Sequence, residues 1–250
     1  MLNIREQITH HLKQLHMPSM RGCYEQIADQ ARKETFSYEQ YLLELIQLEC
    51  EGRRENHIAR NLRVSKLPPS KTFENFDKNR LPARIATHLN VLSDGSFLKR
   101  SENVLAFGNP GSGKTHLLCA IGHALIEQDK RVLFTSCSQL VQDLLIAKRD
   151  LTMIKQLKKL SRFDAVIIDD IGYVQHSRQE MEVLFTFMAD RYEYGSLMIS
   201  SNLPFSKWEQ IFKDPMTAAA AIDRLVHHSI VLELNLPSYR LEHSKKNKKE

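Results

Sequence analysis

The stretch GNPGSGKTHLL, residues 108–118, decides the fold of this chain. It contains the phosphate-binding pattern G-x-x-x-x-G-K-S/T, which is matched by Gly108, Gly113, Lys114 and Thr115. The apolar run NVLAF at 103–107 precedes the pattern and an amphipathic stretch follows it, which predicts a strand, a loop and a helix in that order. A chance match in a chain of this length is on the order of one in a hundred before this context is counted.

Each part of this loop has a task in binding a nucleotide. The glycines let backbone N–H groups turn inward around the phosphates, and the positive end of the following helix faces the same phosphates. Lys114 would reach the β and γ phosphates, and Thr115 would offer its hydroxyl to Mg²⁺. The sequence therefore predicts ATP and Mg²⁺ as cofactors, with the nucleotide held by Gly108, Asn109, Pro110, Gly111, Ser112, Gly113, Lys114, Thr115 and His116.

An acidic pair follows the apolar run AVIID, with Asp169 fifty-five positions after Lys114 and Asp170 directly behind it. Ligands of open α/β sheets bind beyond the carboxyl ends of the strands, so Asp169 is expected to hold Mg²⁺ together with Thr115. Asp170 is the candidate to orient or deprotonate the attacking water. Asn202 ends the run SLMISSN and could hydrogen-bond the γ-phosphate or that water, although an Asn before Leu-Pro is also typical of a turn.

Short apolar runs rich in β-branched residues alternate with helical stretches over most of the chain. The runs lie at 103–107, 131–136, 165–169, 196–201 and 229–234, and the helical stretches include 115–128, 139–149 and 179–194. This alternation predicts an α/β fold with a parallel sheet covered by helices on both faces.

The front of the chain has helical periodicity instead. Ser37 is a plausible N-cap with Gln40 three residues later. The helix behind it is expected to turn Tyr41, Leu42, Leu45, Ile46 and Leu48 toward a core. LPPS at 67–70 then breaks the chain. The predicted organisation is a small all-α domain at 1–66, a linker at 67–75, the α/β domain at 76–242 and a basic tail at 243–250.

Composition narrows the class of protein. The chain has 250 residues, a formal net charge of +5, 42% hydrophobic and 26% charged residues, which is typical of a globular protein and excludes disordered and fibrous classes. No stretch resembles a signal peptide or approaches eighteen apolar residues, so we expect a cytoplasmic protein without a membrane span. The cysteines are far apart, which argues against a disulfide framework or zinc site and predicts buried thiols at Cys23, Cys50, Cys119 and Cys137.

Five segments resemble, in order, those of a known family: GNPGSGKTHL, VIIDDIGYV, ISSNLPFSKW, AAIDRLVHHS and LPSYR. They are similar to the AAA+ ATPases of the bacterial replication-initiator and helicase-loader branch, and within it to IstB, the ATPase helper of an insertion-sequence transposase. The resemblance covers nearly the whole chain, because EQYLLELIQLECEGRRENHIARNLRVSKLP also resembles the IstB amino-terminal domain. It implies a homo-oligomer that binds ATP at subunit interfaces.

The resemblance also implies roles for single residues. Asn202 would sense the γ-phosphate, Arg224 would be the arginine finger that reaches the neighbouring subunit's site, and Arg240 would be the second sensor. A guanidinium suits such a task because it stays charged. The usual acidic pair of these ATPases is Asp-Glu, whereas Asp170 is one methylene shorter. We therefore predict slow hydrolysis that another ligand accelerates.

Two basic segments are the predicted DNA contacts: Arg53, Arg54, Arg60, Arg63 and Lys66 in the first, and Lys155, Lys158 and Lys159 in the second. Phosphate contacts need only suitably spaced positive charge, so duplex binding would be salt-sensitive and largely independent of sequence. The function implied is an ATP-dependent helper that assembles on duplex DNA, prepares the target and stimulates the transposase of the same element. The alternatives are a replicative helicase loader acting on single strands, a small-molecule P-loop kinase, and a nucleotide-locked DNA-binding module without useful hydrolysis.

Overall fold

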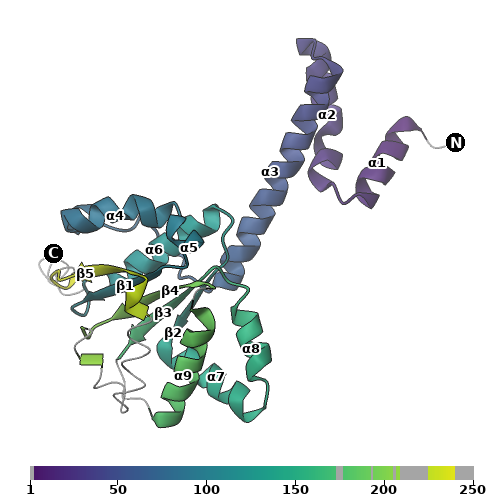
Figure 1. The fold of residues 1–250 in the computed structure, drawn as a ribbon. Helices are drawn as coiled ribbons and strands as arrows, with labels where there is room; N and C mark the ends of the chain where they lie inside the picture. The colour runs from purple at the N-terminus through teal and green to yellow at the C-terminus, as the bar shows by residue number, and fades with distance from the viewer. Residues whose placement is uncertain (1–2, 173–176, 193, 205–206, 209–224, 240–250) are drawn as a thin grey trace, which may run out of the picture. The chain divides into compact units, whose positions relative to one another are not determined.

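The computed structural model describes residues 3–172, 177–192, 194–204, 207–208 and 225–239. The chain divides into two compact units, Met1–Arg60 and Asn61–Glu250, whose elements are labelled in Figure 1. The division falls inside α3 (Tyr38–Ser65), the long helix that follows α1 (Ile4–Gln14) and α2 (Pro18–Glu34). The domain boundaries inferred from the sequence remain a prediction.

The first unit is helical, and one buried carboxylate organises it. Glu49 of α3 accepts hydrogen bonds from the backbone N–H groups of Ser19 (2.9 Å) and Met20 (3.1 Å) in the first turn of α2. It also accepts one from Arg53 Nε at 2.9 Å. The carboxylate thus binds the positive end of α2, where a negative charge is favourable.

The capping prediction for α3 is confirmed, but the buried face of the helix is narrower than the sequence predicts. The backbone N–H of Ser37 donates to Gln40 Oε1 at 2.8 Å, and the backbone N–H of Gln40 donates to Ser37 Oγ at 3.2 Å. Leu45 is buried, whereas Leu42 and Ile46 are 53% and 44% exposed. Few elements surround this long helix, so only a narrow stripe of its surface is buried. Apolar residues outside that stripe remain exposed to solvent.

The second unit is built on a parallel sheet, as predicted. Its strands are β1 (Asn103–Gly108), β2 (Val132–Ser136), β3 (Ala165–Ile171), β4 (Ser196–Ser201) and β5 (Ser229–Leu234). They form a five-stranded sheet in the order β2-β3-β4-β1-β5, with every neighbouring pair parallel. The carboxyl ends of β1, β3 and β4 therefore lie side by side in the middle of one edge (Figure 1).

Helices cover both faces of this sheet. They are α4 (Ala83–Ser93), α5 (Ser96–Lys99), α6 (Lys114–Glu127), α7 (Cys137–Arg149), α8 (Met153–Leu160) and α9 (Arg178–Arg191), with a short 3-10 turn, η1, at Lys78–Arg80. On one face, Leu105 and Ile168 share a core with Leu144 of α7 and Phe187 of α9. On the other, α6 approaches so closely that a Cβ at Gly122 would lie 3.0 Å from Ile167 Cδ1. Burial on both faces explains why the strands are apolar throughout.

A buried arginine ties the strand ends opposite the carboxyl edge. The guanidinium of Arg191, 3% exposed, donates to the carbonyl oxygens of Phe163 (2.7 Å), Asp164 (3.1 Å) and Ser196 (3.1 Å). Burial lowers the pKa of Arg191 to about 10, which leaves it charged at neutral pH. It joins the starts of β3 and β4.

The stretch predicted as a linker packs along α6. Leu67 is buried and would lie 3.3 Å from a Cβ at Gly122. His116 and His123, both on α6, form hydrogen bonds to the carbonyl oxygens of Thr72 (3.0 Å) and Pro68 (3.1 Å). Residues 67–72 are thus fastened to the helix that begins at the phosphate-binding loop.

The prediction of four buried thiols has a mixed outcome. Cys119 and Cys137 are buried thiols and burial raises the pKa of each to about 12, but Cys50 is exposed and Cys23 only partly buried. Cys50 lies on α3 in the first unit, which consists of few helices and gives an apolar side chain less to pack against. Among the helices that the structure describes, none is long and apolar enough to span a membrane.

Candidate nucleotide-binding site

The phosphate-binding loop lies between β1 and α6, as predicted. Gly111 and Gly113 have φ angles of 79° and 98°, in the left-handed region that favours glycine. The Nζ of Lys114 donates to the carbonyl oxygens of Gly108 and Asn109, both at 2.9 Å, and to Asn202 Oδ1 at 2.6 Å. Lys114 is only 4% exposed, so these oxygens take the place of water around its ammonium and hold it at the loop.

The predicted metal ligands also meet. Thr115 Oγ1, in the first turn of α6, donates to Asp169 Oδ1 at 2.7 Å. The same oxygen accepts a 2.6 Å hydrogen bond from Ser200 Oγ on β4. Two hydroxyls therefore fix one carboxylate oxygen of Asp169.

Asp170 lies in a β-bulge, which the sequence did not predict. On β4, Ile199 pairs with Ile168 and Ser201 pairs with Ile171, so the single residue Ser200 faces both Asp169 and Asp170. Asp170 has a φ of 57°, and its backbone N–H donates to Ser200 Oγ at 2.9 Å. The bulge brings the exposed Asp170 into the lining of the cavity described next.

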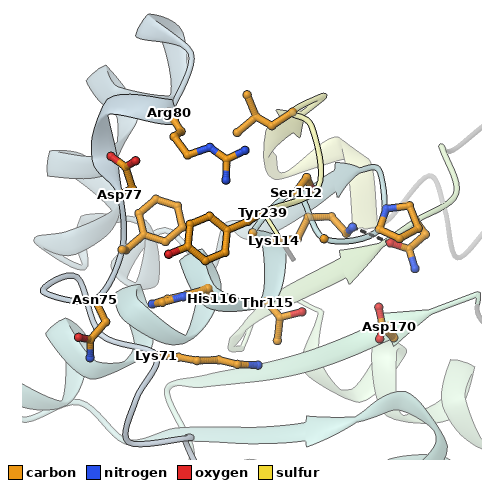
Figure 2. Close-up of a pocket in the computed structure, with 16 residues that line it drawn as sticks. Lys71, Asn75, Asp77, Arg80, Ser112, Lys114, Thr115, His116, Asp170 and Tyr239 are labelled. Atoms are coloured by element: carbon orange, nitrogen blue, oxygen red, sulfur yellow. Dashed lines mark hydrogen bonds between the residues drawn. The ribbon is translucent and has the colours of Figure 1, made fainter. Parts of the chain in front are cut away.

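A cavity of about 430 Å³ opens over the loop (Figure 2). The predicted residues that line it are Pro110, Gly111, Ser112, Gly113, Lys114, Thr115, His116, Asp170 and Asn202. Sequence reasoning missed its other walls, which include Lys71, Phe76 and Arg80 before the loop and Tyr239 far behind it. A volume of this size is that of a small-molecule site.

The wall before the loop combines an aromatic ring, a histidine and a cation. Phe76 packs edge-on against His116 with ring centroids 5.1 Å apart. Burial lowers the pKa of His116; the hydrogen bond to Thr72 O raises it and the nearby Lys71 ammonium lowers it, so the net pKa lies below its usual value, which favours the neutral imidazole. The side chain of Lys71 extends toward Thr115 in Figure 2, and its Nζ lies 5.9 Å from the Phe134 ring centroid. The string KTFENF, 71–76, carries the signal that could have found this wall: a cation and aromatics just before an α/β domain.

The wall behind the loop is formed by residues 236–239. The backbone N–H of Tyr239 donates to Gly111 O at 3.0 Å, and Arg80 Nη2 donates to Pro237 O at 3.0 Å. The Arg80 guanidinium also lies over the Tyr239 ring, 5.2 Å from its centroid. Hydrogen bonds and a cation–π contact thus bring together segments that are 157 residues apart.

These residues fit a nucleoside triphosphate with Mg²⁺. Ser112 is one of the lining residues, and its Oγ is buried without a hydrogen-bond partner among the described residues, so the loop holds a hydroxyl donor that has no acceptor. Thr115 and Asp169 supply the oxygen ligands that Mg²⁺ prefers. Lys114, Lys71 and Arg80 supply positive charge around the cavity, and Phe76 and Tyr239 supply rings suited to a base.

The remaining predicted residues lie elsewhere or outside the described residues. Arg224 and Arg240, the predicted finger and second sensor, lie outside the described part of the chain. Arg53 donates to Glu49 and, through Nη2, to His16 O at 3.0 Å, so its charge is already matched within the first unit. The spacing of Glu49 and Arg53 is that of an i,i+4 ion pair, which was visible in the sequence. The other predicted DNA contacts are also exposed: Arg54, Arg60, Arg63, Lys155, Lys158 and Lys159 on helices α3 and α8, and Lys66 directly after α3.

Comparison with known sequences gives consistent matches. Residues 10–247 match the family described as IstB-like ATP binding protein. The chain is 40% identical over 230 residues to an insertion sequence ATP-binding protein of Sinorhizobium fredii, which covers 92% of this chain and 77% of that protein. It is 35% identical over 235 residues to the ATP-binding protein of insertion sequence IS21 from Pseudomonas aeruginosa, with 94% of this chain and 89% of that protein covered.

Comparison with known structures gives the same fold. DnaA from Aquifex aeolicus with bound AMPPCP has a TM-score of 0.55 and 21% identity, over 74% of this chain and 56% of that one. DnaI has a TM-score of 0.56 and 19% identity, over 67% of this chain and 94% of that one. At these identities the likeness concerns the AAA+ P-loop fold alone.

Proposed function

Since the chain belongs to the IstB-like ATP binding protein family and is an ATPase of the AAA+ type, we propose that it is an ATP-dependent helper of DNA transposition. In this proposal it assembles on duplex DNA with ATP, prepares the target and stimulates the transposase of the same insertion sequence. The names of its relatives place them in insertion sequences, which supports a transposase as partner. The structural observation that carries the proposal is the meeting of the phosphate-binding loop with the acidic pair: Asp169 accepts a hydrogen bond from Thr115, and Asp170 lines the cavity over the loop.

The described residues support a hydrolytic reaction. Lys114 would bind the β and γ phosphates, while Thr115 and Asp169 would hold Mg²⁺, which when bound offsets the charge of those phosphates. Asp170 would accept a proton from water as the water oxygen bonds to the γ phosphorus and the bond to the β–γ bridging oxygen breaks. Asn202, hydrogen-bonded to Lys114 at 2.6 Å, is close enough to contact the same phosphate.

We infer slow hydrolysis without a further ligand. The short carboxylate of Asp170 and its exposed position leave room for a water that is poorly fixed. In the assembled form Arg224 from the neighbouring subunit would add the positive charge that the transferring phosphoryl group needs, and Arg240 would sense the same nucleotide. ATP between two subunits would stabilise the assembly, and hydrolysis would remove that link.

Helix α8 supports contact with DNA. Lys155, Lys158 and Lys159 are exposed along its eight residues, so their ammonium groups are accessible to a phosphate backbone. The basic part of α3 would contribute through Arg54, Arg60 and Arg63, together with Lys66 directly after the helix. Arg53 is a weaker candidate because Glu49 already binds it.

The test is steady-state ATP hydrolysis by the full chain at moderate salt, alone, with duplex DNA and with single-stranded DNA of the same length. Lys114→Ala serves as the blank, and a Lys155→Ala, Lys158→Ala, Lys159→Ala triple variant tests α8. We expect duplex DNA to stimulate hydrolysis most, and the triple variant to lose that stimulation while keeping its basal rate.

Each outcome decides something. Stimulation mainly by single strands would contradict the transposition helper and favour a helicase loader. Indifference to both DNAs would remove DNA as the partner. Hydrolysis that persists in the Lys114 variant would refute the assignment of the catalytic site itself.

A further inference from the structure

Ser200 is a buried residue of the neighbouring strand whose side chain contacts both residues of the acidic pair. It lies on β4, is fully buried, and its side chain reaches the acidic pair on β3. Its hydroxyl donates to Asp169 Oδ1 at 2.6 Å and accepts from the backbone N–H of Asp170 at 2.9 Å. One serine therefore contacts the predicted metal ligand and the backbone of the predicted base.

The chemistry of a hydroxyl suits both contacts at once. A serine side chain has one hydrogen to donate and lone pairs to accept, so donating to Asp169 leaves it able to accept from Asp170. The hydrogen bond to Asp169 is charge-assisted and therefore stronger than one between neutral groups. Together with Thr115, Ser200 fixes Oδ1 and leaves the other carboxylate oxygen to a metal ion.

The second contact acts on a strained backbone. Asp170 has a φ of 57°, in the left-handed region that residues with a side chain seldom adopt. The bulge places Ser200 opposite Asp169 and Asp170 together, and the backbone N–H of the extra residue donates to the Ser200 hydroxyl. Accepting that N–H helps to keep Asp170 in the orientation that lines the cavity.

We propose that Ser200 is a positioning residue of the ATPase site, which sets the orientation of Asp169 and Asp170 through its hydroxyl. The inference rests on the proposed roles of these two carboxylates. A residue that orients a metal-binding carboxylate typically changes activity or metal affinity by about 10–100-fold when it is removed. Ser200 does not contact the nucleotide in this scheme, so its loss affects the rate more than nucleotide binding.

Strand β4 supplies a matched control. Ser196 lies four residues earlier on the same face of the strand, is also fully buried, and its Oγ has no hydrogen-bond partner among the described residues. Ser196→Ala therefore removes the same hydroxyl from the same strand without breaking a described hydrogen bond. Ser200→Thr keeps the hydroxyl but adds a methyl group, which separates the effect of packing from that of the hydrogen bonds.

The experiment measures kcat, the Kd of a non-hydrolysable ATP analogue, the Mg²⁺ concentration at half-maximal rate, and the melting temperature of each full-length variant. We expect Ser200→Ala to lower kcat about 10–100-fold and raise the Mg²⁺ requirement, with a Kd within about threefold of the wild type. Ser196→Ala should keep the wild-type kcat. Ser200→Thr should have a lower melting temperature than the wild type, because of its added methyl group. It should nevertheless hydrolyse ATP faster than Ser200→Ala, because it keeps the hydroxyl.

Three results would overturn the proposal: an unchanged kcat in Ser200→Ala, an equal loss in Ser196→Ala, or a Ser200→Thr variant as slow as Ser200→Ala. Asp169→Asn and Asp170→Asn tell this failure apart from failure of the site assignment. If both retain hydrolysis, the proposed roles of the carboxylates are wrong. If both lose it while Ser200→Ala does not, only the inference about Ser200 is wrong.

Discussion

Gly111→Ala is predicted to weaken ATP binding by displacing the wall formed by residues 236–239. Gly111 has a φ of 79°, and a Cβ added there would overlap Ser238 Oγ and lie 3.0 Å from Ser238 Cβ. Both the loop backbone and the wall therefore resist a side chain at this position. The wall must move away, or the loop must leave the conformation that faces the phosphates.

The expected size follows from the interactions at stake. Left-handed backbone costs alanine about 1–2 kcal/mol. Displacing the wall loses the hydrogen bond from Tyr239 N–H to Gly111 O, about 1 kcal/mol, and the contact of Arg80 with the Tyr239 ring, about 0.5–1 kcal/mol. The sum is about 3 kcal/mol, and since about 1.4 kcal/mol is a factor of ten, the Kd should rise up to about 100-fold.

The assay is calorimetric titration of the full chain with a non-hydrolysable ATP analogue in Mg²⁺. Gly95→Ala is the matched control. Gly95 also has a left-handed φ, 69°, but it lies in the turn between α4 and α5 and is not among the described residues that line the cavity. It should lower the melting temperature while leaving the Kd unchanged. A Gly111→Ala variant with wild-type Kd would refute the reasoning, and so would a loss that Ser238→Gly in the same chain fails to reduce.

Three further predictions concern a cation, a carboxylate and a guanidinium. Lys71→Ala should raise the Kd for the ATP analogue about 3–10-fold in the same titration, because its ammonium lines the cavity, whereas Lys78→Ala, whose Nζ lies over Phe73, should not; equal effects would contradict a local role. Burial raises the pKa of Glu49, but hydrogen bonds from Arg53 and two backbone N–H groups together lower it by more than burial raises it. The net pKa therefore lies below its usual value. Its stabilisation is complete above roughly pH 4.3, the ordinary glutamate pKa, and is lost as pH falls through the lower folded pKa; the gap in melting temperature between wild type and Glu49→Gln should therefore shrink in acid, and a constant gap would contradict this. Arg191→Met should cost at least about 3 kcal/mol in denaturant unfolding because several buried carbonyl oxygens lose their donor; Lys148→Met, which breaks the exposed ion pair with Glu182, should cost under about 1 kcal/mol, and a similar cost for both would refute the reasoning.

Local patterns explain what the sequence predicted well. The strands and the loop were recognisable because an apolar run, a glycine-rich turn and an amphipathic helix are short-range signals. Lys114, Thr115, Asp169 and Asn202 then meet at the site because parallel strands bring their carboxyl ends to one edge.

Long-range contacts explain what the sequence missed. Arg80 and Tyr239 face each other across the fold, and no periodicity connects two residues so far apart. The bulge at Asp170 depends on pairing with β4, so spacing along β3 alone could not reveal it. The exposed faces of Leu42 and Ile46 depend on how few elements surround α3, which is a property of the packed unit and not of the helix.

The wall at 236–239 has a consequence for how the protein is made. The loop that it closes lies at 108–113, so nearly half of the chain emerges from the ribosome between the two. A growing chain therefore builds the sheet and the loop before it has a complete cavity, and Gly111 receives its contacts only when Tyr239 arrives. If the wall contributes to ATP binding as proposed, full-strength binding requires a chain that extends at least to Tyr239.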